Sequence, residues 1–190
     1  MMAFMITAEN GGSILLIGAN SRAAANTFLS GLFIHLIVWF IWAVSVKFIS
    51  EESDLSLDDL RGFAHRNPIV CAALLLSHFT VSGMPLLAGF RLRMALLTSC
   101  FEFSGVLGWT ASIASAILIF SGLRLLVIFL SHPERESEPA AADERSRYEL
   151  LSRRELLLFL MLLLLLIGFS PSLMELFING IRTQYVLVFG

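Results

Sequence analysis

Long apolar segments without formal charge alternate with short charged segments along this 190-residue chain. The uncharged windows lie between Arg22 and Lys47, between Arg66 and Arg91, between Glu102 and Arg124, and between Glu155 and Glu175. Each window is comparable in length to the roughly 20 mostly apolar residues of a membrane-spanning helix. The pattern therefore predicts an all-α polytopic membrane protein with about four transmembrane helices.

The expected spans are 27–49, 68–103, 106–130 and 156–174, and together they form a bundle over 27–181. Residues 1–26 are expected to be the stub of a preceding helix or a surface segment, and 182–190 a tail. Polar connectors follow the first and the third span. The second connector is expected to be solvated, with a short helix near 145–154 as its one candidate element.

The second span carries residues that interrupt a helix. Gly83, Pro85 and Gly89 lie close together inside it, and residues of these types break or kink helices. The stretch 68–103 is also too long for one straight span, yet no polar loop of ordinary size divides it. We therefore expect one discontinuous helix, or two half-helices that meet inside the membrane. Such breaks often mark ion sites.

The distribution of basic residues predicts the orientation in the membrane. If the second window crosses once, both connectors share a side, and seven arginines lie there: Arg61, Arg66, Arg135, Arg145, Arg147, Arg153 and Arg154. Only Arg22 and Arg182 fall on the opposite side. The connectors are therefore expected on the cytoplasmic or matrix side, and the C-terminus on the periplasmic or intermembrane-space side.

Composition excludes several other classes of protein. The chain is 57% hydrophobic and 15% charged, whereas soluble domains carry about 25% charged residues. With a net charge of −2 the chain lacks the excess of positive charge that is typical of nucleic-acid-binding proteins. Cys71 and Cys100 both fall in apolar windows, so neither a disulfide framework nor a metal site is expected.

Ionisable residues inside a membrane are costly and usually functional. The candidates are His35, His78, Arg91, Arg93, Glu102 and Arg124. Each has a plainer interpretation: the arginines at 91 and 93 as interface residues that extend to the headgroups, His35 as a hydrogen-bonding group between helices, and Glu102 as an interface anchor. For His78, packing and protonation stay open. Arg124 either extends to the interface or pairs with a glutamate of a neighbouring subunit. Motifs of soluble enzymes are absent from the sequence, and no catalytic residue is assigned.

The residues around the expected break resemble a segment of the antiporter-like subunits of respiratory complex I. The most similar is subunit N of the bacterial enzyme, called NADH dehydrogenase subunit 2 in mitochondria. That family typically has a DL-x-GL-x-x-R-x-P opening, an apolar run that ends in LSLAGIPP, and then GF with a lysine three residues after the phenylalanine. The matching segments here are DLRGFAHRNP at 59–68, FTVSGMP at 79–85 and GF at 89–90. The resemblance covers about 27–181.

The resemblance implies that this chain is the C-terminal part of a longer antiporter-like fold, in split or truncated form. It implies a membrane-arm subunit of a proton-translocating NADH:quinone oxidoreductase that contributes part of a proton half-channel, holds no redox cofactor and is not catalytic alone. The implied partners are the other membrane-arm subunits, lipids and a separate chain that supplies the upstream helices. A split subunit suggests the mitochondrial inner membrane, with the bacterial plasma membrane as the alternative.

Two departures from the family bear on this expectation. Arg93 stands where the family has a lysine, and arginine stays protonated in proteins whereas a desolvated lysine can release its proton. Phe120, Ser121 and Gly122 replace tyrosines that are common before Arg124. Along the expected polar axis of Arg93, His78 and Arg124, either His78 takes over protonation or the half-channel is weakened. The alternatives are a structural subunit of the same complex that has lost pumping, and a fragment of a multisubunit cation/proton antiporter.

Overall fold

The computed structural model describes Gly11 and residues 22–52, 60–132 and 144–170, with side chains described in 31–51, 60–132 and 153–170. Within these ranges every regular element is a helix, which confirms the expected all-α fold. The elements are α2 Arg22–Glu52, α3 Phe63–Arg66, α4 Pro68–Ser82, α5 Gly89–Phe103, α6 Gly105–Leu130 and α7 Glu144–Phe169.

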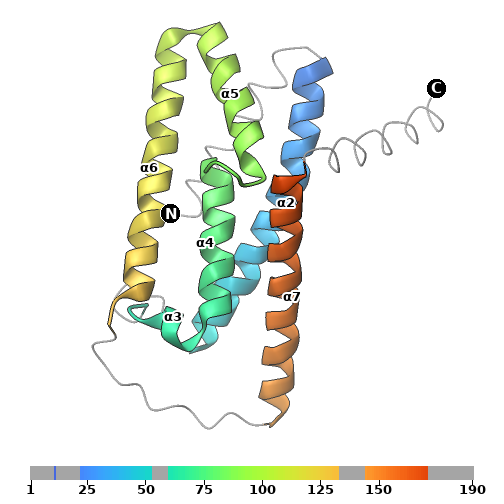
Figure 1. Ribbon diagram of the computed structural model, residues 1–190, viewed down its shortest axis with the longest axis vertical. Helices are drawn as coiled ribbons and strands as arrows, with labels where there is room; N and C mark the ends of the chain where they lie inside the picture. Colours follow the sequence, from blue (N-terminus) through green and yellow to red (C-terminus); the bar gives the residue numbers. More distant parts are fainter. Residues whose placement is uncertain (1–10, 12–21, 53–59, 133–143, 171–190) are drawn as a thin grey trace, which may run out of the picture.

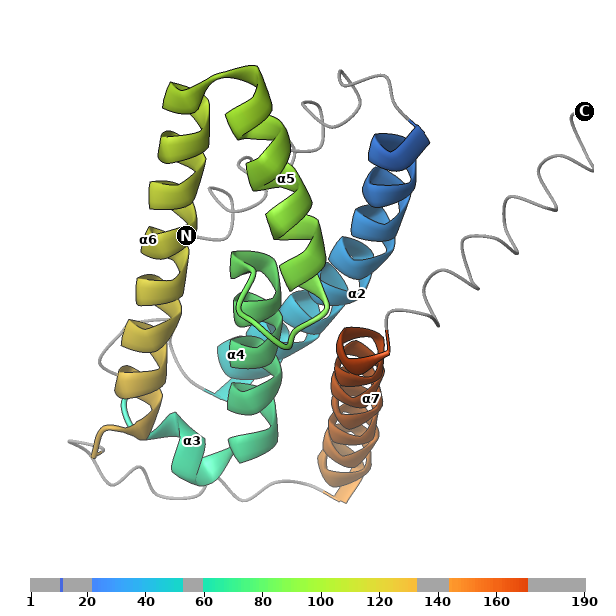
Figure 2. The same cartoon turned by 45° about the horizontal axis from the view of Figure 1, so that its top comes forward.

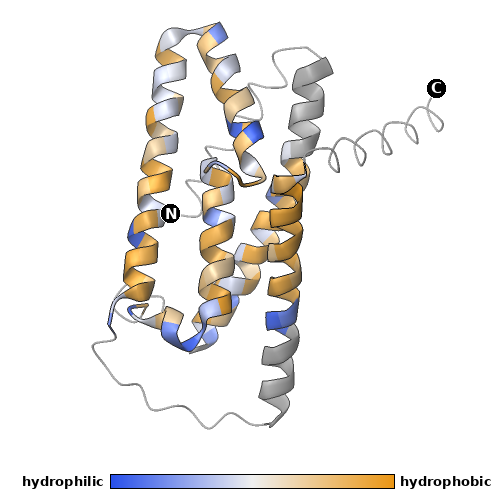
Figure 3. Cartoon of the chain, viewed as in Figure 1, coloured by the Kyte–Doolittle hydropathy of each residue, from blue (hydrophilic) through white to orange (hydrophobic). Residues whose placement is uncertain are grey.

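The long apolar helices correspond to the predicted spans. By length and composition, α2 and α6 can each cross a membrane, through Gly31–Glu51 and Gly105–Leu130, and α4 is a shorter apolar helix. Figure 3 shows hydrophobic residues along most of these helices and hydrophilic residues gathered around α3 and beside it on α7. The bundle thus has an apolar middle and a polar end.

The predicted interruption of the second span is confirmed. The helix α4 ends at Ser82 and α5 begins at Gly89, so a short non-helical segment, residues 83–88, separates two helices of 15 residues each. Figures 1 and 2 show that α4 and α5 run in the same general direction, one beyond the other, before α6 returns alongside both. The two half-helices together therefore make one crossing.

The helix α4 is the centre of the bundle, and it packs against α2, α5, α6 and α7. The chain runs down α2, up through α4 and α5, down α6 and up α7 (Figure 1). As a result the end of α2, the end of α6 and the start of α7 lie at the same end of the molecule, beside α3. This arrangement agrees with the expectation that both connectors share a side.

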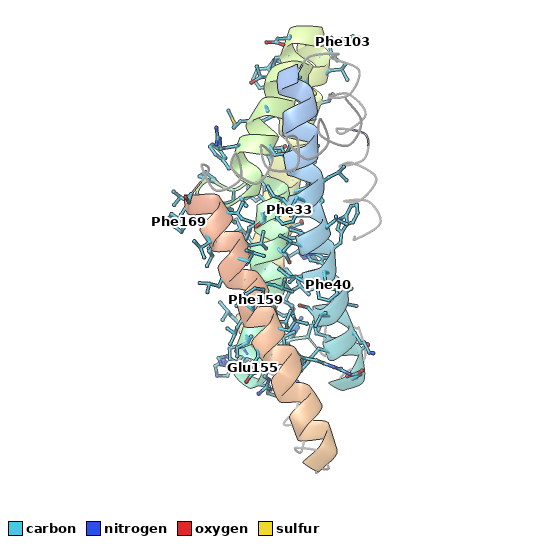
Figure 4. All side chains as sticks on the ribbon, turned by 90° about the vertical axis from the view of Figure 1, so that its right-hand side faces the viewer. Phe33, Phe40, Phe103, Glu155, Phe159 and Phe169 are labelled. Atoms are coloured by element: carbon cyan, nitrogen blue, oxygen red, sulfur yellow. The ribbon has the colours of Figure 1, made fainter. Side chains whose placement is uncertain are left out.

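The main core lies between α2, α4 and α7. Its fully buried members include Val38 and Ile41 of α2, Val70 of α4, and Leu157 and Leu164 of α7. The opposite faces of α2 and α7 carry exposed phenylalanines, of which Figure 4 labels Phe40, Phe159 and Phe169. Apolar residues on both faces of a helix are expected where the outer face meets lipid or another membrane protein.

The helix α7 begins at Glu144, so the short helix expected near 145–154 is the first part of one long helix. Two arginines attach this part to the rest of the bundle. Arg153 forms an ion pair with Glu51 of α2, and Arg154 Nη2 donates to Asn67 Oδ1, 2.6 Å away, just before α4. The predicted stub at 1–21, most of the second connector and the tail lie outside the described residues.

Candidate functional site at the interrupted helix

The C-terminus of α4 closes in a motif that depends on Gly83. Gly83 adopts φ = 78°, its N–H donates to Thr80 O at 3.2 Å, and the N–H of Met84 donates to Phe79 O at 3.0 Å. This pair of bonds is the Schellman arrangement, in which a left-handed residue, usually glycine, ends the helix. The sequence therefore stops α4 at a defined position instead of letting the helix fray.

The closure leaves the carbonyl of Val81 available to another donor. In a continuous helix this oxygen would accept from residue 85, but Pro85 has no N–H. Instead Arg93, in the first turns of α5, donates from Nη2 to Val81 O at 2.9 Å. The arginine is buried, with 8% of its surface exposed. A cation at this place is favourable because the carbonyl end of a helix carries partial negative charge.

Two glycines allow α5 to approach α4 this closely. A Cβ on Gly83 would lie 2.5 Å from both Cβ and Cγ of Arg93, and a Cβ on Gly89 would lie 1.8 Å from Thr80 O. Both distances are far below van der Waals contact. The sequence predicts only that these residues interrupt the helix, and the structure gives each a separate role. Gly83 ends α4 and leaves room for Arg93, and Pro85 lacks the N–H that Val81 O would otherwise bind. Gly89 lets the two half-helices cross.

His78 is the second polar group near the break, one turn before Val81. Its side chain is fully buried, and Nε2 lies 2.9 Å from Leu118 O and 3.1 Å from Ser121 Oγ, both on α6. A carbonyl oxygen only accepts, so Nε2 carries the proton. Gly122 makes room for this ring, because a Cβ there would lie 2.6 Å from His78 Cδ2.

The other face of His78 meets α2. The indole of Trp42 stacks on the imidazole with ring centroids 6.0 Å apart and an interplanar angle of 12°. Among the described residues, the buried atoms His78 Nδ1, Trp42 Nε1 and Ser45 Oγ have no hydrogen-bond partner. Ser45 lies one turn after Trp42 and so on the same face of α2. Unsatisfied buried polar atoms are rare, so three of them in α2 and α4 distinguish this part of the bundle from the rest of its apolar core.

The structure brings Arg93 and His78 to the last two turns of α4 but does not bring Arg124 there. Arg124 is exposed, and it lies two residues after Gly122, so it projects from the opposite side of α6. Arg91 and Glu102 are also exposed, whereas His35 is buried and stacks on Trp39 of its own helix. Trp42 and Ser45 were not singled out by sequence analysis, because nothing in an apolar helix shows which of its residues will face His78.

These observations define the class of protein: an integral membrane protein of apolar helices, built around a discontinuous helix whose carbonyl end binds a buried cation. Comparison with known proteins identifies the family. Residues 2–118 match the family described as NADH:quinone oxidoreductase/Mrp antiporter, transmembrane. This match covers more than half of the chain and includes the interrupted helix, so the chain belongs to this family.

Individual relatives agree with the family assignment. The chain is 35% identical over 92 residues to NADH-quinone oxidoreductase subunit N of Chloroflexus aggregans, which covers 46% of this chain and 18% of that protein. It is 23% identical over 156 residues to subunit N 2 of Opitutus terrae, covering 79% of this chain and 30% of the relative. The predicted resemblance to subunit N is thus confirmed, and the chain spans less than a third of the length of either relative.

A solved structure has the same fold. A chain of respiratory complex I from Thermus thermophilus superposes with a TM-score of 0.62 and 20% sequence identity, covering 90% of this chain and 38% of that chain. The likeness extends over α2 to α7 as a whole, because nearly the entire chain is matched. It shows that the helices are arranged as in that chain of respiratory complex I.

Proposed function

We propose that this chain is a membrane-arm subunit of a proton-translocating NADH:quinone oxidoreductase, in which it contributes part of a proton half-channel and carries no redox centre. The family and the fold support the assignment to this complex. The observation that carries the proposed role is the hydrogen bond from buried Arg93 to the free carbonyl of Val81 at the helix break. Oxidation of NADH and reduction of quinone would take place on other subunits.

In this proposal Arg93 and His78 have different roles. Arg93 keeps its proton, so it acts as a fixed positive charge that holds the two half-helices together. His78 is the group that exchanges a proton, because its Nε2–H is bound to α6 and its Nδ1 lone pair is unused. A proton bound at Nδ1 makes the ring cationic, and release of that proton from Nδ1 makes it neutral again while Nε2–H stays bound to Leu118 O. Arg124 belongs to this polar axis only if the axis continues on the outer side of α6.

The test is proton pumping by the assembled complex. Arg93→Ala should lower the number of protons pumped per NADH oxidised, whereas Arg91→Ala, which changes an exposed arginine two residues away, should leave it unchanged. His78→Phe keeps an aromatic ring beside Trp42 and removes both nitrogens, and it should also lower the ratio. Undiminished pumping per NADH in Arg93→Ala would reject a role for Arg93.

A structural subunit that has lost pumping is the second candidate, and the arginine at the lysine position favours it. In that case Arg93→Ala and His78→Phe would both leave the ratio unchanged while lowering the amount of assembled complex. Membership of the family also fits a fragment of a multisubunit cation/proton antiporter. Co-purification separates this third candidate, because flavin and iron–sulfur subunits would then be missing from the isolated complex.

The proposed partners are the other membrane-arm subunits, lipids and a separate chain that supplies upstream helices. In the related chains, of which this chain covers 18% to 38%, the further helices belong to the same polypeptide, so the proposal of a separate chain is tested directly. Mass spectrometry of the purified complex would reveal it.

The resemblance to a split subunit suggests the mitochondrial inner membrane, with the C-terminus in the intermembrane space. The relatives named above are bacterial, which favours the alternative of a bacterial plasma membrane with a periplasmic C-terminus. A protease-protection assay on membranes that contain the protein with a C-terminal epitope tests on which side of the membrane the C-terminus lies.

A further inference from the structure

The outer side of α6 carries a continuous apolar stripe that no described residue covers. Its members recur every three or four positions, so they share one face of the helix, and each is between 57% and 75% exposed: Val106, Trp109, Ile113, Ile117, Phe120 and Val127. Arg124 lies inside this stripe, four residues after Phe120 and three before Val127, and it is exposed as well. Apart from Thr110, whose exposed hydroxyl donates to Leu107 O, this face is thus apolar along its length except for one cation.

Arg124 lies too deep for an ordinary headgroup contact. It is six residues before Leu130, where α6 ends, which corresponds to about 9 Å along the helix axis. Its Cα–Cβ bond tilts toward the N-terminus of α6 and therefore toward the membrane interior, away from the nearer end. Among the described residues it has no hydrogen bond or ion pair. A guanidinium in this position is costly when it faces only acyl chains.

We infer that this face of α6 binds a transmembrane helix of a second, different polypeptide, and that an aspartate or glutamate of that helix pairs with Arg124. A carboxylate can accept two parallel hydrogen bonds from a guanidinium, which satisfies the charge and fixes the register of the two helices. The flanking side chains suit such a contact, because aromatic residues and arginine are enriched at the centres of protein interfaces. The apolar residues of the stripe then pack against the partner on either side of the pair.

A second copy of this chain does not fit this surface. None of the four uncharged windows defined above contains an aspartate or glutamate between its bounding residues, so the copy has no carboxylate at the required depth. The inference rests on the membrane location of the chain, and it depends neither on assembly into complex I nor on proton transfer.

Site-specific photo-crosslinking in intact membranes tests this interface. A photoreactive phenylalanine analogue replaces Phe120 in the stripe, and in a parallel variant it replaces Phe159, which is similarly exposed on α7. We expect the Phe120 variant to capture a different polypeptide through a transmembrane segment with an aspartate or glutamate within one helical turn of the crosslink. Capture of lipid alone, of a second copy, or of a segment without such a residue would overturn the inference.

Charge changes at Arg124 provide the second measurement. Arg124→Glu should reduce the crosslink from position 120 by about tenfold or more, as expected when one member of a buried charge pair is lost. The yield at position 159 should not change, and an acidic-to-arginine change in the partner should restore the yield at 120. If Arg124→Glu prevents folding, Arg124→Gln removes the charge at lower cost. An unaffected crosslink in the variant that folds would refute the ion pair. A captured partner from outside complex I would keep this inference and contradict the proposed function.

Discussion

Replacing Gly83 by alanine tests the account of the helix break most directly. An alanine at φ = 78° adopts the left-handed region at a cost of roughly 1–2 kcal/mol. Its Cβ would also lie 2.5 Å from the stem of Arg93, and crowding of this kind in a packed interior costs about 1–3 kcal/mol. Both effects act in the folded state, so we expect Gly83→Ala to lower the free energy of unfolding by about 2–5 kcal/mol.

The same substitution should displace the arginine. To regain ordinary contact the stem must move by roughly 0.9 Å, and such a shift is enough to break the 2.9 Å bond from Nη2 to Val81 O. Loss of stability should therefore be accompanied by loss of proton pumping in the assembled complex. If Gly83→Ala pumps normally, the position of Arg93 does not matter for function.

Gly105→Ala is the matched control, since a Cβ at Gly105 has nothing within 4 Å. Both variants can be compared as full chains in mixed micelles, by following the loss of helical circular dichroism as denaturing detergent is added. Gly105→Ala should unfold at the same detergent fraction as the original chain, and Gly83→Ala at a clearly lower one. Equal midpoints for the two variants would refute the argument from backbone strain and close approach.

Three further substitutions follow from the same contacts. Gly89→Ala places a Cβ 1.8 Å from the backbone oxygen of Thr80, so we expect a loss of more than about 3 kcal/mol in the same denaturation assay. Gly122→Ala crowds His78 and should cost about 2–3 kcal/mol, and a change in tryptophan fluorescence should report the shifted imidazole. Glu51→Gln removes a partly exposed ion pair with α7, and a loss of more than about 1 kcal/mol would contradict its assignment as a surface contact.

The sequence predicts the helices and the break because both depend on local chemistry. Uncharged windows of spanning length correspond to α2 and α6, and the glycines and proline at 83–89 end one helix and begin the next regardless of distant contacts. The extent of α7 was harder to predict. Its first part is charged and has no apolar periodicity, and the described contacts of this part, those of Arg153 and Arg154, are made with residues far away in the sequence.

The candidate site was only partly predictable for the same reason. Arg93 could be selected from its place after the break, but its acceptor, Val81 O, is a backbone atom that becomes available only when the helix closes. The neighbours of His78 are Trp42 on α2 and Leu118 on α6, far from it in sequence. Which face of α6 carries Arg124 depends on how α6 is rotated against α4, and periodicity is uninformative in a helix that is apolar all round.

The helix α7 contacts both ends of α4. In its first half Arg154 binds Asn67, just before α4. Near its end Gly168 lies so close to the backbone of the break that a Cβ there would be 2.9 Å from Leu86 O and from Ala88 N. Packed helices transmit displacement because interiors are dense. The helix α7 therefore runs along the whole of α4 and contacts it at both ends. A displacement of α7 along its axis would therefore press directly on residues 83–88, the segment that sets the distance between Arg93 and Val81.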